Sequence, residues 1–197
     1  MKKETSRFIA VLLMAVMASA TMIAADWAAF DLKGKVKSVT YYNYSCPYMW
    51  PYNDEVKKVS FNASGKVIAP RHVKVVRNKK GVAINFKYYM ADWGEWFDQE
   101  LTYDSNGRVI RRCSGGVDGG GCDENYYDEK GRLYQSIVNA EVEGEEIRIV
   151  TYYEYKSFDA KGNWTKRVCT TTTSYISGEF PSETTTSTET RKIVYYK

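Results

Sequence analysis

Apolar and polar residues alternate along much of the chain after residue 25, with the period of two that is typical of β-strands. The segment at residues 81–89 alternates apolar Val82, Ile84, Phe86 and Tyr88 with Ala83, Asn85 and Lys87. The segment at residues 150–158 places Val150 and Tyr152 opposite Thr151, Tyr153 and Tyr155. No segment in this part of the chain has a sustained helical period, so the pattern predicts an all-β protein.

A short motif recurs between these segments: an aromatic residue, Asp or Asn, two variable residues, Gly, a basic residue or Asn, and an apolar residue. Its five copies are FDLKGKV at Phe30, FNASGKV at Phe61, YDSNGRV at Tyr103, YDEKGRL at Tyr127 and FDAKGNW at Phe158. The Asp or Asn side chain can accept hydrogen bonds from nearby backbone N–H groups, and Gly can adopt the left-handed conformation that closes a three-residue loop. We therefore expect each copy of this hairpin motif to join two antiparallel strands.

The C-terminal part predicts one long hairpin, with arms at Trp164–Tyr175 and Glu183–Tyr196. Runs of Thr in both arms suit a half-exposed strand face. Residues 26–197 are thus expected to form a single β-repeat domain. Its predicted fold is an antiparallel meander of successive hairpins with roughly 10–12 strands, arranged as an open curved sheet or in a sandwich-like form.

The N-terminus has the pattern of a secretory signal peptide. Lys2, Lys3 and Arg7 precede a run without charges from Phe8 to Ala25. Cleavage of this segment, residues 1–25, is expected after Ala20 or Ala25. The sequence therefore predicts an exported protein that is periplasmic, on the outer surface or secreted, with no transmembrane segment after cleavage.

Composition narrows the possible chemistry. The chain has 17 Tyr and 5 Trp but one His, which excludes a metal site built on two imidazoles. Cleavage after Ala20 removes three basic residues and one acidic residue, so the formal net charge falls from +4 to +2 and a nucleic-acid partner is not expected.

Residues 56–91 carry nine basic side chains and no acidic one, whereas residues 92–104 carry five acidic side chains and no basic one. This segregation indicates charge pairing between neighbouring strands, with an anion-binding face as the alternative.

The four cysteines lie after the predicted signal peptide. Cys113 and Cys122 flank the Gly-rich segment SGGVDGGG and are expected to form a disulfide, which leaves Cys46 and Cys169 as the second pair. Buried free thiols are the alternative. No CxxC spacing or Cys/His cluster is present, so neither a metal nor a cofactor is expected.

The units at Tyr103 and Tyr127 resemble the YD repeats of the Rhs family. The segments DLKGKVKSV, at Asp31–Val39, and RKIVYY, at residues 191–196, are similar to small exported YD-repeat-like proteins of Bacteroidetes. The resemblance implies a β-hairpin architecture and a cell-envelope setting. It implies no catalytic residue, because the repeat has none to transfer.

Aromatic residues outside the hairpin motif are the first candidates for ligand binding. They are concentrated in residues 46–52 and 88–97: Tyr48, Trp50, Tyr52, Trp93 and Trp96. Exposed rings beside carboxylates and amides are suited to stacking on sugars, whereas the alternative role is to cover the ends of the sheet. Asp92, Glu95, Asp98 and Glu100 are candidates for a glycosidase carboxylate pair, although the sequence gives no distances between them.

These features predict a non-enzymatic protein of the bacterial cell envelope that acts as a binding or structural module. One alternative is a carbohydrate-binding or carbohydrate-active protein that uses the Trp- and Tyr-rich segments. The other is an immunity-like accessory protein that binds a partner protein through an exposed strand edge. A polysaccharide or an envelope protein is the expected partner.

Overall fold

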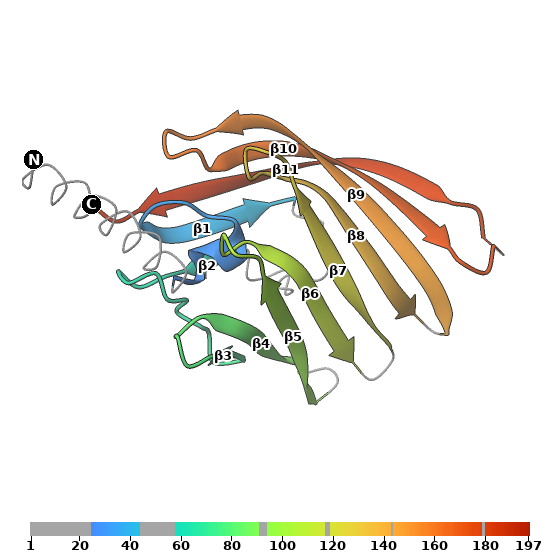
Figure 1. Ribbon diagram of the computed structural model, residues 1–197, viewed down its shortest axis with the longest axis horizontal. Helices are drawn as coiled ribbons and strands as arrows, with labels where there is room; N and C mark the ends of the chain where they lie inside the picture. The colour runs from blue at the N-terminus through green and yellow to red at the C-terminus, as the bar shows by residue number, and fades with distance from the viewer. Residues whose placement is uncertain (1–24, 44–57, 91–93, 117–118, 143, 179) are drawn as a thin grey trace, which may run out of the picture.

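The computed structural model describes residues 25–43, 58–90, 94–116, 119–142, 144–178 and 180–197. In these residues one 3₁₀ helix, η1 (Asp26–Phe30), precedes eleven strands of a single antiparallel sheet (Figure 1). The strands are β1 (Val36–Tyr42), β2 (Lys58–Ser60), β3 (Val73–Arg77), β4 (Ala83–Met90), β5 (Glu95–Tyr103), β6 (Val109–Gly116), β7 (Gly119–Tyr127), β8 (Leu133–Val142), β9 (Glu145–Phe158), β10 (Trp164–Tyr175) and β11 (Glu183–Tyr195).

The order of strands across the sheet is β2-β1-β11-β10-β9-β8-β7-β6-β5-β4-β3. From β3 to β11, each strand lies beside the strand that follows it in the chain, as in a meander. The prediction of an open antiparallel meander of hairpins is confirmed, and the single sheet selects the curved form over the sandwich-like form. The C-terminal hairpin, formed by β10 and β11, also matches the expected arms closely.

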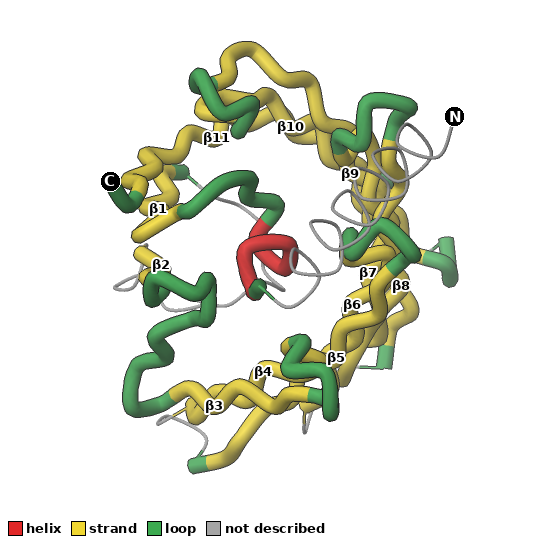
Figure 2. Tube along the Cα trace, turned by 60° about the vertical axis from the view of Figure 1, so that its left-hand side comes forward, coloured by secondary structure: helices red, strands yellow, loops and turns green. Residues whose placement is uncertain are grey.

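The sheet curves around η1, which lies within its concave side (Figure 2). We call the face toward η1 the inner face and the opposite face the outer face. Phe30 at the end of η1 packs edge-on against Phe61 and Phe86, with ring centroids 5.5 and 5.7 Å away. The hydrophobic core therefore lies between η1 and the inner face, where burial of apolar surface stabilises both elements.

Asp26 connects the two margins of this open sheet. Its carboxylate, in a residue only 2% exposed, accepts a 2.6 Å hydrogen bond from the backbone N–H of Val67, just after β2. The same carboxylate forms an ion pair with Arg77 of β3, whose Nη2 lies 2.6 Å from Oδ2. In the sequence, Asp26 directly follows one of the two predicted cleavage sites. No sequence pattern indicates that its carboxylate links the two edges of the sheet.

The turn of the motif forms as expected at four of its five copies, which begin at Phe61, Tyr103, Tyr127 and Phe158. The last three join two strands, whereas the copy at Phe61 is followed only by the isolated bridge between Phe61 and Val67. In the copy between β5 and β6, the Asp104 N–H donates to the Arg108 carbonyl at 2.9 Å, and the Gly107 N–H donates to the Asp104 carbonyl at 3.0 Å. Asp104 Oδ1 also accepts the N–H groups of Asn106 and Arg108, each at 2.9 Å. Gly107 has φ 77°, which a side chain would strain.

The copy at Phe30 is different, and the expectation of a hairpin there is wrong. It connects η1 to β1, and no strand precedes it in the described chain. Asp31 itself adopts the left-handed conformation, with φ 50°, and its Oδ2 accepts a 3.0 Å hydrogen bond from the Trp164 indole N–H. The motif therefore specifies a local turn, whereas its neighbours in the chain decide whether that turn joins two strands.

A further turn of the same kind, which the motif does not include, lies between β3 and β4. The Asn78 N–H donates to the Val82 carbonyl at 3.0 Å, and the Gly81 N–H donates to the Asn78 carbonyl at 2.9 Å. This turn follows Arg77 instead of an aromatic residue, and Val82 occupies the place of the basic residue. The turn is therefore specified by Asn followed three residues later by Gly, without the aromatic and basic residues of the motif.

A bulge beside this turn also corrects the predicted alternation of residues 81–89. The pairing with β3 shifts between Val76↔Asn85 and Arg77↔Ala83, so Ile84 is the extra residue. Phe86 is buried on the inner face as expected, but Ile84 is exposed. An inserted residue changes the face to which the following side chains belong, and strict alternation cannot anticipate it.

Candidate functional site

Tyrosines of the inner face connect successive hairpins through their hydroxyl groups. The Tyr103 hydroxyl donates to the Ala83 carbonyl at 2.7 Å, and the Tyr127 hydroxyl donates to the Val109 carbonyl at 2.8 Å. Both carbonyls belong to the first residue after the turn of the preceding hairpin. Burial raises the pKa of both phenols, so they remain hydrogen-bond donors over the physiological pH range.

The hydroxyl of Tyr155 makes the equivalent bond in the next hairpin. It donates to the Leu133 carbonyl at 2.7 Å, although Tyr155 lies three residues before the aromatic residue of its own motif, Phe158. Burial raises the pKa of Tyr155 to about 12. Phe158 has no hydroxyl and is exposed, so the hairpin obtains its hydroxyl contact from another strand position.

The motif arginine contacts both its own turn and the next hairpin. Arg108 Nη2 lies 2.6 Å from Asp104 Oδ2, and the guanidinium carbon lies 4.7 Å from the centroid of the Tyr127 ring. Burial raises the pKa of Asp104, but hydrogen bonds and the positive charge of Arg108 outweigh it and hold that pKa below its usual range. Arg132 repeats the ion pair with Asp128 at 2.6 Å. The motif therefore supplies turn geometry and contact between hairpins together.

Arg191 of β11 fixes the end of η1 to the sheet. Its guanidinium donates to the backbone carbonyls of Phe30 at 3.2 Å, Asp31 at 2.9 Å and Trp164 at 2.8 Å. These carbonyls end η1 and begin β10, so one side chain joins three parts of the chain. A buried cation that is satisfied by carbonyl groups in this way is a structural element of the interior.

The Trp164 indole lies between two arginines on the inner face. The guanidinium carbons of Arg167 and Arg191 are 4.3 and 3.9 Å from its ring. Arg167 also forms a buried ion pair with Glu189, with 2.7 Å between Nε and Oε2. Cation–π contact and charge pairing together offset the cost of burying these arginines.

A cavity of about 40 Å³ lies beside this cluster, between η1 and strands β6, β7, β9 and β10. Its lining includes Arg112 and Asp123, which form a buried ion pair with 3.4 Å between Nη1 and Oδ2. Asp123 Oδ1 is buried and has no hydrogen-bond partner among the described residues, and burial raises the pKa of this carboxyl. The cavity has room for about three water molecules. It is therefore too small for a sugar or another organic substrate.

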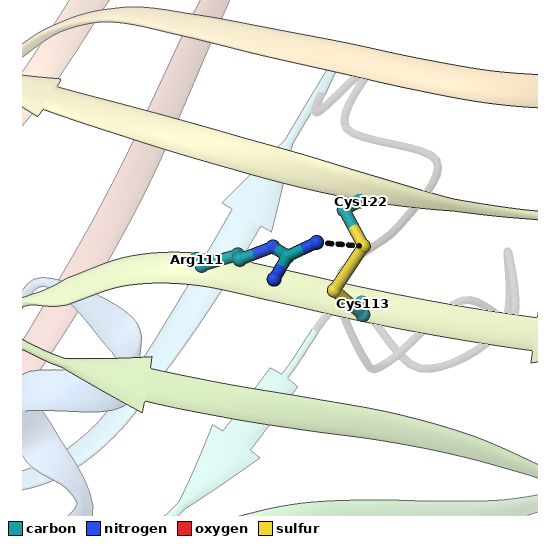
Figure 3. The surroundings of a disulfide bond; sticks show 3 residues. All are labelled: Arg111, Cys113 and Cys122. Carbon is teal, nitrogen blue, oxygen red and sulfur yellow. Dashed lines mark hydrogen bonds between the residues drawn. A yellow bond between two sulfur atoms is a disulfide. The ribbon is translucent and has the colours of Figure 1, made fainter.

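The predicted disulfide between Cys113 and Cys122 is present and joins β6 to β7 on the outer face (Figure 3). The two residues are directly paired in the sheet, with 4.1 Å between their Cα atoms. Arg111 Nη2 donates to Cys122 Sγ at 3.2 Å. Cys169 is buried on β10, whereas Cys46 lies outside the described residues, so their pairing stays a prediction.

Four of the five predicted ligand-binding aromatics, Tyr48, Trp50, Tyr52 and Trp93, lie outside the described residues. Trp96 lies on the outer face of β5, directly opposite Tyr89 of β4, with 5.6 Å between ring centroids. The Lys74 ammonium lies 3.8 Å from the centroid of the Trp96 ring. This cation occupies one face of the indole and leaves less of the ring available for stacking.

The candidate carboxylates of β5 do not form an isolated pair. Asp98 and Glu100 share the outer face, but Asp98 Oδ1 lies 2.9 Å from Lys87 Nζ on β4. This ion pair is one example of the expected charge pairing between neighbouring strands. Asp98 and Glu100 border a shallow hollow of about 260 Å³ whose floor includes Gly115 and Gly121. Asp92 lies outside the described residues, and Glu95 lies exposed at the start of β5.

The outer face also carries three exposed tyrosines outside the predicted ligand-binding segments. Tyr126 of β7, Tyr134 of β8 and Tyr152 of β9 are 38%, 43% and 54% exposed. We call them the outer tyrosine surface. The alternation along the strand places Tyr152 on the face opposite to Tyr153 and Tyr155. Because η1 lies against the inner face, this alternation places Tyr152 on the outer face.

The chain matches no known family model and no curated protein. In the described parts of the chain, no helix is long and apolar enough to cross a membrane. The same parts contain no group of three or more His, Cys, Asp or Glu side chains arranged to hold a metal ion.

Proposed function

We propose that this protein is an exported β-hairpin module of the bacterial cell envelope, and that it acts without catalysis as a binding or structural component. The observation that carries the proposal is the use of the hairpin motif. Its Asp, Arg and Tyr side chains, which are the chemically versatile residues of the repeat, are engaged in turns and in contacts between hairpins. This leaves the exposed outer face as the surface available for recognition.

Two further observations support an envelope location. The charged N-terminal segment and the apolar run that follows it have the pattern of an export signal. The disulfide between Cys113 and Cys122 suits an oxidising compartment, because cytosolic thiols are usually kept reduced.

Expression of the full chain in a bacterium tests the location. We expect the mature protein in the periplasmic, outer-surface or secreted fraction, with an N-terminus at Thr21 or Asp26 by mass spectrometry. The Leu12→Arg variant places a charge in the apolar run and should remain in the cytoplasm, with Cys113 and Cys122 open to alkylation. An uncleaved wild-type chain in the cytoplasm would contradict the proposal.

The absence of catalysis has its own test. The purified mature protein is incubated with aryl glycosides, polysaccharides and aryl esters, and product release is measured. We expect no turnover above the background of the heat-denatured protein. Turnover that is lost in the Glu95→Gln or Asp98→Asn variant would replace the module by an enzyme that uses the carboxylates of β5.

Carbohydrate binding is the second candidate, and the exposed pair of Trp96 and Tyr89 favours it. Rings beside lysine and carboxylate side chains can stack on sugars while their neighbours bind hydroxyl groups. Tryptophan fluorescence of the protein with oligosaccharides is the measurement. A saturable change that disappears in the Trp96→Ala variant would support this site, and an unchanged titration in that variant would exclude it.

A further inference from the structure

The register of strands β7, β8 and β9 brings Tyr126, Tyr134 and Tyr152 to one area of the outer face. Gln135 of β8 is paired with Tyr126 on one side and with Tyr152 on the other. Directly paired residues share a face of the sheet, so the amide of Gln135 lies between the two tyrosines. The two rings stand on strands that are two positions apart, which separates their Cα atoms by about 10 Å.

Tyr134 joins this surface because of a bulge. The pairing of β7 with β8 shifts between Tyr126↔Gln135 and Tyr127↔Leu133, which makes Tyr134 the extra residue of β8. Strict alternation would direct Tyr134 to the inner face, opposite to Gln135. It is instead exposed, next to Gln135, whose partner across the sheet is Tyr126.

Charges of both signs lie around the outer tyrosine surface. Tyr126 donates a 3.0 Å hydrogen bond to Glu124 Oε2, and Lys156 forms an ion pair with Glu154. The exposed Arg111 of β6 is directly paired with Glu124. Side chains of both signs are therefore interspersed near the rings, with no block of one sign to attract a charged polymer.

Hydroxyl groups continue the surface toward the C-terminal hairpin. Thr170 of β10 is paired with Tyr152, and Thr186 of β11 is paired with Thr170. One row across five strands thus reads Tyr126, Gln135, Tyr152, Thr170 and Thr186. Ring faces, an amide and hydroxyls alternate along it, which differs from the continuous apolar centre of a typical protein interface.

We propose that the outer tyrosine surface binds a neutral, extended polysaccharide, with Tyr152 as its principal stacking residue. The inference rests on the proposed role as an envelope binding module. The rings of Tyr126 and Tyr152 stack on sugar units separated along the chain, and Gln135 and Thr170 bind hydroxyl groups between and beyond them. The mixed charges favour a neutral glycan, and the row of paired residues from β7 to β11 favours a chain long enough to cross several strands.

Tyr152 is better placed for this role than Trp96. It is the most exposed aromatic residue in the part of the chain that the structure describes, whereas the Lys74 ammonium covers one face of the Trp96 indole. An accessible ring face is the requirement for stacking on the C–H groups of a sugar. The two surfaces lie on different strands, so substitutions can separate them.

Affinity electrophoresis of the mature protein, followed by titration calorimetry, is the direct test. The neutral probes are hydroxyethylcellulose, xylan and galactomannan in gels, and cellohexaose, xylohexaose and mannohexaose in solution. Polygalacturonate is the acidic comparison. We expect retardation by at least one neutral probe and none by polygalacturonate. The Tyr152→Ala variant should weaken binding at least tenfold, and Tyr126→Ala should weaken it severalfold.

Tyr42→Ala is the matched control, because Tyr42 is 44% exposed on the same outer face but on β1. It should bind as the wild-type protein does, and all variants should retain the wild-type unfolding transition. Retardation by polygalacturonate alone, by no probe, or equally in the Tyr152→Ala variant would overturn the glycan proposal. Loss of binding in Trp96→Ala alone would move the site to β5. None of these outcomes alters the fractionation result, so failure here is distinguishable from failure of the envelope proposal.

Discussion

Two pairs of adjacent tyrosines show how the two faces of the sheet differ. Tyr127 and Tyr153 lie on the inner face, where their hydroxyls bond the Val109 carbonyl at 2.8 Å and Ser136 Oγ at 3.0 Å. Their neighbours Tyr126 and Tyr152 lie on the outer face and are exposed. Inner tyrosines therefore combine apolar bulk with a fixed hydrogen bond, whereas outer tyrosines present a ring to solvent. Tyrosines on the inner face therefore hold neighbouring hairpins together, whereas tyrosines on the outer face are available for recognition.

The largest expected contrast comes from truncating one member of the Tyr126 and Tyr127 pair. Tyr127→Ala removes a packed ring, a hydrogen bond and the contact with Arg108, and should lower the free energy of unfolding by about 3 kcal/mol. Tyr126→Ala should change it by less than about 0.5 kcal/mol. Urea unfolding followed by far-ultraviolet circular dichroism measures both. Equal losses would mean that the two faces do not differ in this way.

The disulfide tests whether the outer face also contributes to stability. Replacement of Cys113 and Cys122 by Ser together removes a covalent link that closes a loop of about ten residues. The free energy of unfolding should fall by about 2–3 kcal/mol, mainly through greater freedom of the unfolded chain. Unfolding of the wild-type protein with and without reductant is the parallel measurement. A stability unchanged by both treatments would show that the link is dispensable.

Removal of a single hydroxyl gives a finer comparison. Tyr127→Phe keeps the ring but leaves the Val109 carbonyl without its donor, so it should cost about 1 kcal/mol. Tyr126→Phe loses an exposed bond to Glu124 and should cost close to nothing. Both variants are compared by the midpoint of urea unfolding at constant slope. A larger loss in Tyr126→Phe would reverse the assignment of the two faces.

Alkaline titration tests the burial of an inner-face tyrosine directly in the wild-type protein. Burial raises the pKa of Tyr155 to about 12 in the folded protein, above the unfolded value of about 10. Its contribution to stability is therefore complete below pH 10 and is lost as the pH rises through 12. Absorbance at 295 nm should show a late ionisation step, near pH 12, to which Tyr155 contributes. In Tyr155→Phe the late step should shrink, and an unchanged late step would contradict its assignment.

Local patterns in the sequence predict the hairpins well because each turn depends on a few neighbouring residues. Asp104, Asp128 and Asp159 specify turns that the chemistry of Asp and Gly makes recognisable. The same reasoning failed at Phe30, where η1 precedes the motif, and at Asn78, where the flanking residues depart from the pattern. The curvature around η1 and the pairing of β1 with β11 were not predictable, since both depend on residues far apart in the chain.

The candidate surface was harder to predict because a bulge changes the face of a single residue. Tyr134 is adjacent to Gln135 and yet shares its face, which no alternating pattern specifies. Trp96 is recognisable in the sequence as an aromatic residue outside the motif, but its contact with Lys74 comes from β3, about twenty residues earlier in the chain. The buried partnership of Asp26 with Arg77 was likewise hidden, because long-range ion pairs have no local signature.

The pairing of β1 with β11 also sets an order in time. Most strand pairs join segments that are adjacent in the chain, and such hairpins can form soon after both arms are available. Strand β1 must wait for β11, which is almost the last segment to be synthesised. Arg191, which fixes the end of η1, arrives with the same strand. The first elements of the chain therefore acquire their final contacts last, and a chain truncated before β11 should expose its hydrophobic core.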